Sequence, residues 1–563
     1  MYSAVLFAAL AAIASGTPTA TIGNGITFNG MDRNGVEIFL GIQYGKDTGG
    51  SNRFKPPRAF EPNPNSVFQA TSYGDACPQS VSSRTPVIAP VTVSENCLNL
   101  NVARPKGATE KDKLPVMVYI YGGGLWTGVT QAQVVAPDGL ILESVSNGLP
   151  IVHVALNHRL GVFGFAQSDF LKSEKSENAG LRDQRLALEW VRDNIASFGG
   201  DPNKVTIFGQ SSGGLSVGMQ LLAYGGSKPF PFHQAICQSQ ALEPGITGNY
   251  TFKAMTAVAQ HANCSTDIHT SSSIECLRSL TTQQLFNSSL ETYDDTSNFG
   301  DIWLPSVDGD FLPDAPSELI KQSKYAQVTT MMGWCENDLA RFIDPGVQTS
   351  KDTKKTVQDY ARDMSPENVK HLLSLYPELD FHANKAAGLS AEFYRSAQIL
   401  RDILMVCQPM YFAQHMASTG NDVFLYDWNQ TMLGPMLDSR GQPGRGVVHT
   451  SELGYVFGNI SAYNTSGLAF NPTQSDYDLQ DKASRSWSGF ASTGQLSLPG
   501  RKTFEGFETA YKHDKTRIYV AGGPVEGLYA TASCKKRDAI KVQKLKERCA
   551  FLNRPDIIEQ LKY

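Results

Sequence analysis

The sequence predicts an α/β fold with a large, mostly parallel central sheet flanked by helices, built as a single large domain. Short, nearly continuous apolar runs rich in β-branched and aromatic residues recur along the chain, as in strands that are covered on both faces. Helical patterns lie between these runs, and alternation of strand and helix favours a parallel sheet. No internal repeat and no long Pro/Ser linker divides the 563 residues.

Seven segments are predicted to be buried strands of this sheet. In chain order they are residues 115–121, 150–156, 204–208, 233–238, 327–333, 422–428 and 516–520. The clearest helix is predicted between residues 181 and 200. Apolar residues recur there every three or four positions, and Gly199 and Gly200 end the pattern.

Residues 1–16 are predicted to form a signal peptide, followed by the folded domain over residues 17–563. A short apolar run precedes Ala14-Ser15-Gly16, a small-x-small cleavage pattern, and the run is too short to span a bilayer. The alternative is a buried N-terminal helix. No later window is apolar enough to cross a membrane, and the C-terminal residues carry no lipid-anchor signal. We therefore expect a secreted protein without a stable membrane anchor.

Composition supports an extracellular location and excludes some partners. The net charge of −5 comes with no basic patch, which argues against nucleic acid binding. Six glycosylation sequons occur, at Asn249, Asn263, Asn287, Asn429, Asn459 and Asn464. No metal-binding motif is present, so no metal is expected.

Nine cysteines are more than a cytosolic enzyme usually carries. Three local disulfides are plausible, although spacing alone leaves the connectivity open: Cys77 with Cys97, Cys264 with Cys276, and Cys534 with Cys549. The remaining three cysteines are then expected to be small buried residues: Cys237, Cys335 and Cys407.

The stretch VTIFGQSSGGLSVG, residues 205–218, matches the pattern G-x-S-x-G twice, at Ser211 and at Ser216. Ser211 stands between a predicted strand and a predicted helix, where a sharp turn exposes a nucleophile and requires small residues at positions 209 and 213. Ser216 lies within the helix, and Ser212 lacks glycine at both positions two residues away. Ser211 is therefore the predicted nucleophile, with a purely structural turn as the alternative.

A serine hydroxyl needs a base, a group that orients the base, and donors for the oxyanion formed in acyl transfer. Gly122-Gly123-Gly124, within YIYGGGLWTG, follows a predicted strand and can turn backbone N–H groups toward one point. The alternative for this motif is a flexible turn.

Several blocks occur in one order: SENCLNLNV, YGGGLWTG, NHRLGVFGF, NAGLRDQRLALEWV, NIASFGGDPNKVTIFGQSSGG and FHQAICQS. This arrangement resembles the type-B carboxylesterase/lipase family, which includes cholinesterases and fungal lipases, and is most like its secreted fungal members. The resemblance implies an α/β-hydrolase fold and a serine esterase that needs no cofactor. Its partners would be a small-molecule ester and water.

The resemblance also implies the remaining site residues. GWCENDLARF places the catalytic acid at Asp338, where most members carry Glu, and Glu336 is the rival. GRGVVHTSELGYVFG places the base at His449. The oxyanion would be held by the N–H groups of Gly123, Gly124 and Ser212. The implied structural pairs are the disulfides Cys77–Cys97 and Cys264–Cys276 and the ion pairs Arg53–Glu95 and Arg159–Asp183.

Departures from the family pattern bear on the substrate. Gln210 replaces the Glu that usually precedes the nucleophile, which removes one negative charge. The Cys77–Cys97 loop has no Trp and no apolar helical stripe, which disfavours choline esters and interfacial activation. Leu125 and Trp126 are expected to line the acyl side of the pocket, with plain packing as the alternative.

We therefore expect a secreted serine esterase that cleaves small to medium esters through an acyl-enzyme. A lipase acting on longer-chain acylglycerols is one alternative, and a pathway-specific esterase or acyl transferase acting on a metabolite is another. A binding protein on the same fold would typically have lost a triad residue.

Overall fold

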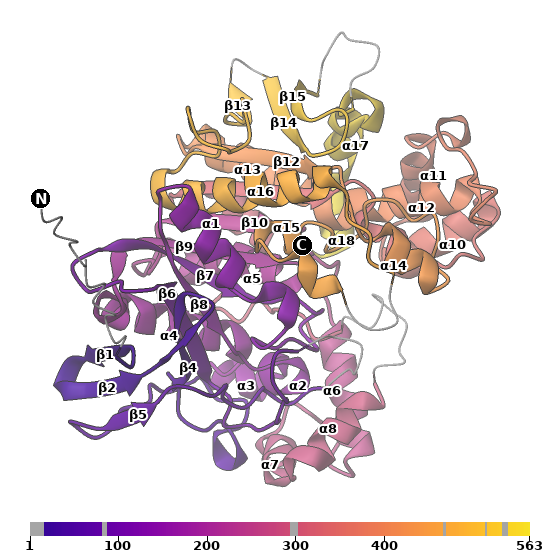
Figure 1. Ribbon diagram of the computed structural model, residues 1–563. Coiled ribbons are helices and arrows are strands. Elements are labelled where there is room, and N and C mark those ends of the chain that lie inside the picture. Colours follow the sequence, from indigo (N-terminus) through magenta and orange to yellow (C-terminus); the bar gives the residue numbers. More distant parts are fainter. Residues whose placement is uncertain (1–15, 81–86, 293–301, 465–468, 513–514, 532–538) are drawn as a thin grey trace, which may run out of the picture.

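A mixed sheet of twelve strands forms the centre of the part of the protein that the structure describes (Figure 1). The computed structural model describes residues 16–80, 87–292, 302–464, 469–512, 515–531 and 539–563. The strand order is β13-β14-β12-β11-β10-β9-β7-β8-β6-β4-β3, and β15 also pairs with β14. A small separate sheet has the order β1-β2-β5.

The strands have the following bounds: β1 Thr19–Ile22, β2 Ile26–Asn29, β3 Met31–Arg33, β4 Val36–Gln43, β5 Val67–Gln69, β6 Asn99–Pro105, β7 Leu114–Ile120, β8 Val152–Leu156, β9 Gly200–Gln210, β10 Gln234–Gln238, β11 Thr329–Cys335, β12 Val423–Trp428, β13 Tyr511–Lys512, β14 Lys515–Ala521 and β15 Gly527–Ala530. The α-helices of eight or more residues are α1 Asp138–Ser146, α4 Ala179–Asn194, α5 Ser212–Leu222, α6 Tyr250–His261, α7 Ser271–Ser279, α8 Thr282–Leu290, α10 Ser350–Tyr360, α11 Pro366–Ser374, α12 Ala391–Arg401, α13 Cys407–Ser418, α16 Gln474–Thr493 and α17 Leu545–Leu552.

All seven predicted strands are present, as β7, β8, β9, β10, β11, β12 and β14, with ends shifted by a few residues. They are neighbours in the sheet, and every pairing among them is parallel. The edge strands are antiparallel and were not predicted. In β4, buried and half-buried side chains partly alternate, so its sequence lacks the continuous apolar run of a central strand.

Two groups of helices cover the sheet. The helices α1 and α16 pack on each other, and α16 also lies against β7 and β9, in front of the strands in Figure 1. The helices α4, α5 and α13 pack on strands β9 to β12. The helix predicted over 181–200 is α4, which a short 3-10 turn extends to Phe198. Gly199, with a φ of 90°, ends it in the left-handed region, as predicted.

Three disulfides are present in the described part of the chain. Cys77–Cys97 and Cys264–Cys276 are the two that the family resemblance implies. The third joins Cys407 to Cys549, which corrects two predictions: Cys549 does not pair with Cys534, and Cys407 is not a free thiol. The spacing argument favoured a partner nearby in sequence, whereas the fold packs α13 on α17 and joins residues 142 positions apart. Cys534 lies outside the described residues. Cys237 and Cys335 are free and buried, as predicted.

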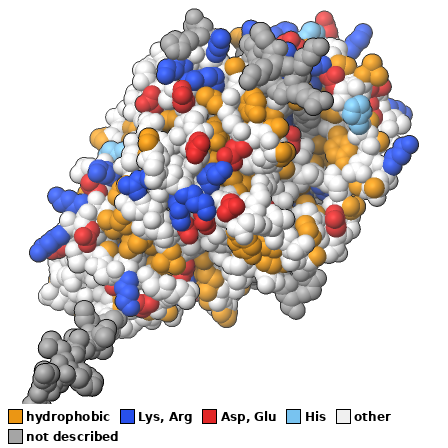
Figure 2. Space-filling model, turned by 45° about the horizontal axis from the view of Figure 1, so that its top comes forward, with side chains coloured by type: hydrophobic (Ala, Val, Ile, Leu, Met, Phe, Trp, Pro, Cys, Tyr) orange, Lys and Arg blue, Asp and Glu red, His pale blue; other side chains and the backbone are white. Residues whose placement is uncertain are grey.

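Both expected ion pairs are buried within the fold. Arg53 contacts Glu95 at 2.5 Å, and Arg159 contacts Asp183 at 2.7 Å. Arg53 also donates to the carbonyls of Leu277 and Leu280, and Arg159 donates to the carbonyl of Lys55. The buried pairs therefore also hold neighbouring backbone segments in place. On the face shown in Figure 2, basic and acidic side chains are interspersed. Within the described ranges, no helix combines the length and the apolarity that a bilayer span requires.

Candidate active site

Ser211 occupies the turn between β9 and α5 at the carboxyl end of the parallel strands. Its backbone has φ 63° and ψ −129°, a sparsely populated conformation for a residue with a side chain. The N–H of Ser211 donates to the carbonyl of Gln238 at 2.9 Å, and its own carbonyl accepts from Leu215 in the first turn of α5. These bonds hold the turn in its strained shape.

The glycines on either side of Ser211 are required by close backbone contacts. A Cβ at Gly209 would lie 2.5 Å from the carbonyl oxygen of Gly213, and a Cβ at Gly213 would lie 2.1 Å from that of Ile120. This is the crowding that the sequence predicted for the serine turn. Ser216, the centre of the second motif match, is buried within α5 and accepts a hydrogen bond from Gln184 at 3.0 Å.

His449 and Asp338 meet beside this turn. The Nδ1 atom of His449 lies 2.6 Å from Oδ1 of Asp338, and the N–H of His449 donates to the Asp338 carbonyl at 3.3 Å. The second carboxylate oxygen of Asp338 accepts from the Ser239 hydroxyl at 2.9 Å and from the Cys335 N–H at 2.8 Å. The carboxylate is fully buried and held by three donors, so its orientation toward His449 is fixed.

Glu336, the rival acid, has different surroundings. Its N–H donates to the Trp428 carbonyl, and its own carbonyl accepts from Arg401 at 2.8 Å. Burial raises the pKa of its carboxyl group, which the Arg401 charge opposes. No hydrogen bond joins it to His449 in the described structure. The geometry therefore favours Asp338 as the partner of His449.

A second buried carboxyl group lies behind the pair. Glu452 is fully buried, accepts from the Cys335 thiol at 3.1 Å, and lies 3.4 Å from the side-chain nitrogen of Gln238. Burial, and secondly the charge of Asp338, raise the pKa of Glu452. A raised pKa favours the neutral form of the Glu452 carboxyl group.

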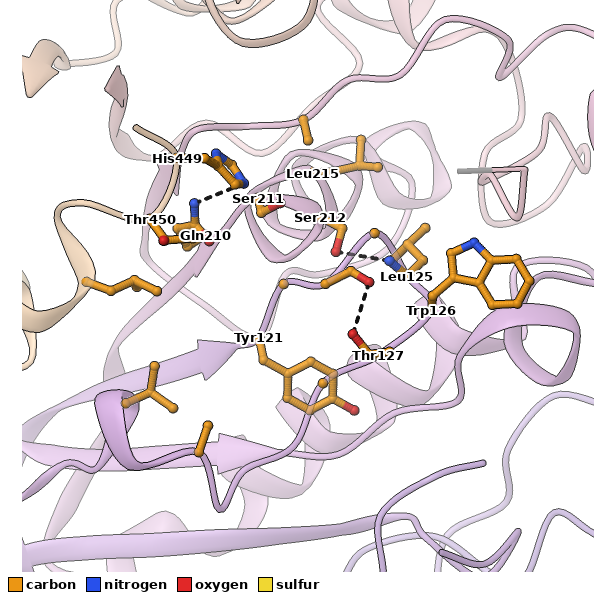
Figure 3. Close-up of a pocket in the computed structure, with 18 of the residues that line it drawn as sticks. Tyr121, Leu125, Trp126, Thr127, Gln210, Ser211, Ser212, Leu215, His449 and Thr450 are labelled. Atoms are coloured by element: carbon orange, nitrogen blue, oxygen red, sulfur yellow. Dashed lines mark hydrogen bonds between the residues drawn. The ribbon is translucent and has the colours of Figure 1, made fainter. Parts of the chain in front are cut away.

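The glycine loop after β7 faces the serine turn. Gly123 has a φ of 131°, and a Cβ there would lie 2.2 Å from the carbonyl oxygen of Thr127. The N–H of Leu125 is occupied by the hydroxyl of Ser212 at 3.1 Å, a contact drawn in Figure 3. Within the described structure, the N–H groups of Gly123 and Gly124 donate to no other backbone or side-chain atom. They are free to serve as oxyanion donors.

These elements surround a cavity of about 680 Å³. Its lining includes Ser211, His449 and the glycine loop, together with the predicted residues Leu125 and Trp126. Trp126 packs edge-on against Trp303, with the ring centroids 6.1 Å apart. A cavity of this volume, lined by apolar side chains together with several polar groups, is typical of a small-molecule site.

Sequence reasoning missed how Gln210 and Phe342 contact His449, the predicted base. The side-chain nitrogen of Gln210 lies 3.3 Å from Nε2 of His449, as Figure 3 shows. Because Nδ1–H points at Asp338, Nε2 is the acceptor in this contact. The Phe342 ring meets the imidazole edge-on, at 5.6 Å between centroids. Residue patterns identify Gln210 as unusual but do not indicate that it reaches His449.

The family model described as "Carboxylesterase family" matches residues 17–522. A protein of Arthroderma benhamiae named as a secreted lipase is 53% identical, covering 98% of this chain and 97% of its own length. An inactive carboxylesterase-like protein of Byssochlamys spectabilis is 33% identical, covering 94% and 92%. The crystal structure of Aspergillus niger EstA, at 23% identity, superposes with a TM-score of 0.78 over 97% of this chain and 99% of its own, and shows the shared fold.

The matched region contains the serine turn, the glycine loop, Asp338 and His449. Together with the extent of the family match and the identity to the Arthroderma protein, this shows that the chain belongs to the carboxylesterase family.

Proposed function

We propose that this carboxylic-ester hydrolase works through an acyl-enzyme on Ser211, with His449 as the base and Asp338 as the group that orients it. The observation that supports this most strongly is the 2.6 Å contact between His449 and Asp338, beside the strained serine turn and inside one cavity. Neither partner lies near Ser211 in the sequence.

The reaction then follows from the geometry. Asp338 holds the imidazole with Nδ1 protonated, so Nε2 can accept the Ser211 proton as the hydroxyl attacks the ester carbonyl. The N–H groups of Gly123, Gly124 and Ser212 stabilise the oxyanion. His449 returns the proton to the leaving alcohol, and a water molecule deprotonated by His449 hydrolyses the acyl-enzyme.

Binding of substrate must move Gln210. Its amide occupies Nε2 of His449, the atom that must accept the serine proton. Catalytic hydrogen bonds often tighten only when substrate is bound, so we expect the amide to give way to the Ser211 hydroxyl in that complex.

Small to medium esters are the proposed substrates. The cavity volume suits a small molecule, and the described residues of the Cys77–Cys97 loop contain no helix that could act as an amphipathic lid. The lipase name of the Arthroderma relative supports the alternative, activity on longer-chain acylglycerols.

A substrate panel tests both parts of this proposal. We expect turnover of soluble short-chain esters that exceeds turnover of emulsified long-chain triglyceride, and labelling of Ser211 by a serine-reactive phosphonate. Ser211→Ala should abolish both, whereas Ser216→Ala, in the second motif match, should retain labelling. Equal turnover by Ser211→Ala and the unmodified enzyme would refute the mechanism, and a preference for emulsified triglyceride would favour a lipase.

We also propose that the protein carries a signal peptide for secretion and is glycosylated. The relative named as secreted is consistent with a signal peptide over residues 1–16, of which residues 1–15 lie outside the described structure. Four of the six sequon asparagines are exposed: Asn249, Asn263, Asn287 and Asn464. Asn429 and Asn459 are partly buried, and the Asn459 side chain donates to the Gln133 carbonyl at 2.7 Å. We expect glycans at the four exposed positions first.

A further inference from the structure

Arg341 lies on the wall of the proposed catalytic cavity, and none of the described residues is an acidic partner for it. Arg341 ends the 3-10 turn Asp338–Arg341, so it is three residues from the proposed catalytic acid, and it lines the cavity with His449 and Phe342. The residue as a whole is exposed to solvent, although the surrounding protein partly desolvates its guanidinium. Within the described ranges it makes no ion pair and no side-chain hydrogen bond. By contrast, the buried arginines Arg53 and Arg159 each contact a carboxylate.

Two further arginines add positive charge around Arg341. Arg445, which is 6% exposed, donates through Nη1 to the carbonyls of Ala340 at 2.6 Å and Ile343 at 3.3 Å, and so supports the turn that carries Arg341. Burial, and secondly the charge of Arg440, lower the pKa of the Arg341 guanidinium. The phenol of Tyr463 acts in the opposite direction on this pKa, and among the described residues no carboxylate forms an ion pair with Arg341.

Among the described residues that line the cavity, no carboxylate forms an ion pair with Arg341. Glu243, the carboxylate among the described lining residues, is 6% exposed and accepts from the Tyr360 hydroxyl at 2.5 Å. Position 210, next to the nucleophile, carries the neutral amide of Gln210. An unpaired guanidinium in a partly desolvated cavity favours an anionic ligand, and its planar fork matches a carboxylate.

We propose that Arg341 binds a carboxylate of the substrate, and that the preferred substrates are esters whose acyl or alcohol part carries a carboxylate group. This inference rests on the proposed function, because the ester must reach Ser211. Arg341 acts as a specificity residue: it anchors the charged end of the substrate near Phe342 while the ester carbonyl lies between Ser211 and the glycine loop.

Matched pairs of esters test the inference. For the alcohol part we use 4-acetoxybenzoate and its neutral amide, 4-acetoxybenzamide. For the acyl part we use monomethyl adipate and methyl 5-carbamoylpentanoate. The measured quantity is the ratio of kcat/KM for the anionic ester to kcat/KM for its neutral partner, which cancels any general loss of activity.

In the unmodified enzyme we expect a ratio above one for at least one pair. Arg341→Gln should lower that ratio by about tenfold or more, mainly through KM, because a charge-assisted hydrogen bond is lost. Arg341→Glu should lower it further, and Arg341→Lys should retain part of it. Added salt should reduce the ratio in the unmodified enzyme and leave it unchanged in Arg341→Gln.

Arg501→Gln is the matched control, since Arg501 is exposed and does not line the cavity. Its ratio should equal that of the unmodified enzyme. Phosphonate labelling of Ser211 in each variant shows that the site is folded. The inference is overturned if neutral esters are hydrolysed but Arg341→Gln leaves both ratios unchanged. Absence of hydrolysis and of labelling in the unmodified enzyme would instead refute the proposed function.

Discussion

Replacing Asp338 by Asn tests the orienting role of the carboxylate, because its two oxygens have different hydrogen-bond partners. One oxygen accepts from the fixed N–H of Cys335 at 2.8 Å and from the Ser239 hydroxyl at 2.9 Å. An amide NH₂ group placed there would oppose the Cys335 donor. The Asn side chain must therefore turn its NH₂ group toward Nδ1 of His449, which lies 2.6 Å from the other oxygen.

That orientation forces the wrong tautomer. With a donor facing Nδ1, the imidazole proton moves to Nε2, which can then no longer accept the Ser211 proton. Loss of the correct tautomer in a serine triad lowers kcat by about 10⁴-fold, with the overall geometry intact. We expect a loss of this order for Asp338→Asn with a soluble short-chain ester in a stopped or continuous spectrophotometric assay.

Glu336→Gln is the matched control, since it removes an acid two residues away that makes no contact with His449. Its kcat should remain close to that of the unmodified enzyme. The amide also resembles the protonated form that burial favours at this position, so the variant should fold. If Asp338→Asn kept most of its activity, or if Glu336→Gln lost as much, the assignment of the orienting acid would be wrong.

Three further outcomes are expected. Gly213→Ala should abolish phosphonate labelling, because a Cβ there lies 2.1 Å from a backbone oxygen of β7; normal labelling would show that the turn tolerates it. Gln210→Glu should shift the acidic limb of the kcat/KM profile to higher pH, because a carboxylate beside His449 favours its protonated form; an unchanged limb would contradict the observed contact. Burial, and secondly Glu336, raise the pKa of Asp427 from 3.8 to about 7, so the folded state loses stability as pH rises through this range. By calorimetry, Asp427→Asn should therefore melt roughly 3 °C above the unmodified enzyme at pH 8 and show little difference near pH 4. An equal difference in melting temperature at pH 4 and at pH 8 would contradict the raised pKa of Asp427 as its cause.

The local sequence determined the parallel centre of the fold and the turn that carries Ser211, the proposed nucleophile. Continuous apolar runs identify β7 to β12 because strands covered on both faces need no polar side. The glycines around Ser211 identify its turn because the backbone contacts that they permit lie next to them in space and sequence. The antiparallel edge strands were not predicted, since strands that are partly exposed, such as β4, lack that continuous signal.

Tertiary structure alone decided which distant groups meet. Cys549 pairs with Cys407 because α13 packs on α17, and spacing had favoured a nearer partner. The turn after β11 directs the Asp338 carboxylate toward His449, which lies in the loop region after β12. The same turn buries the Glu336 carboxyl group near Arg401 instead. The same turn places the unpaired charge of Arg341 on the cavity wall. Side-chain direction at the end of a strand depends on the packing of its neighbours, which the order of residues does not specify.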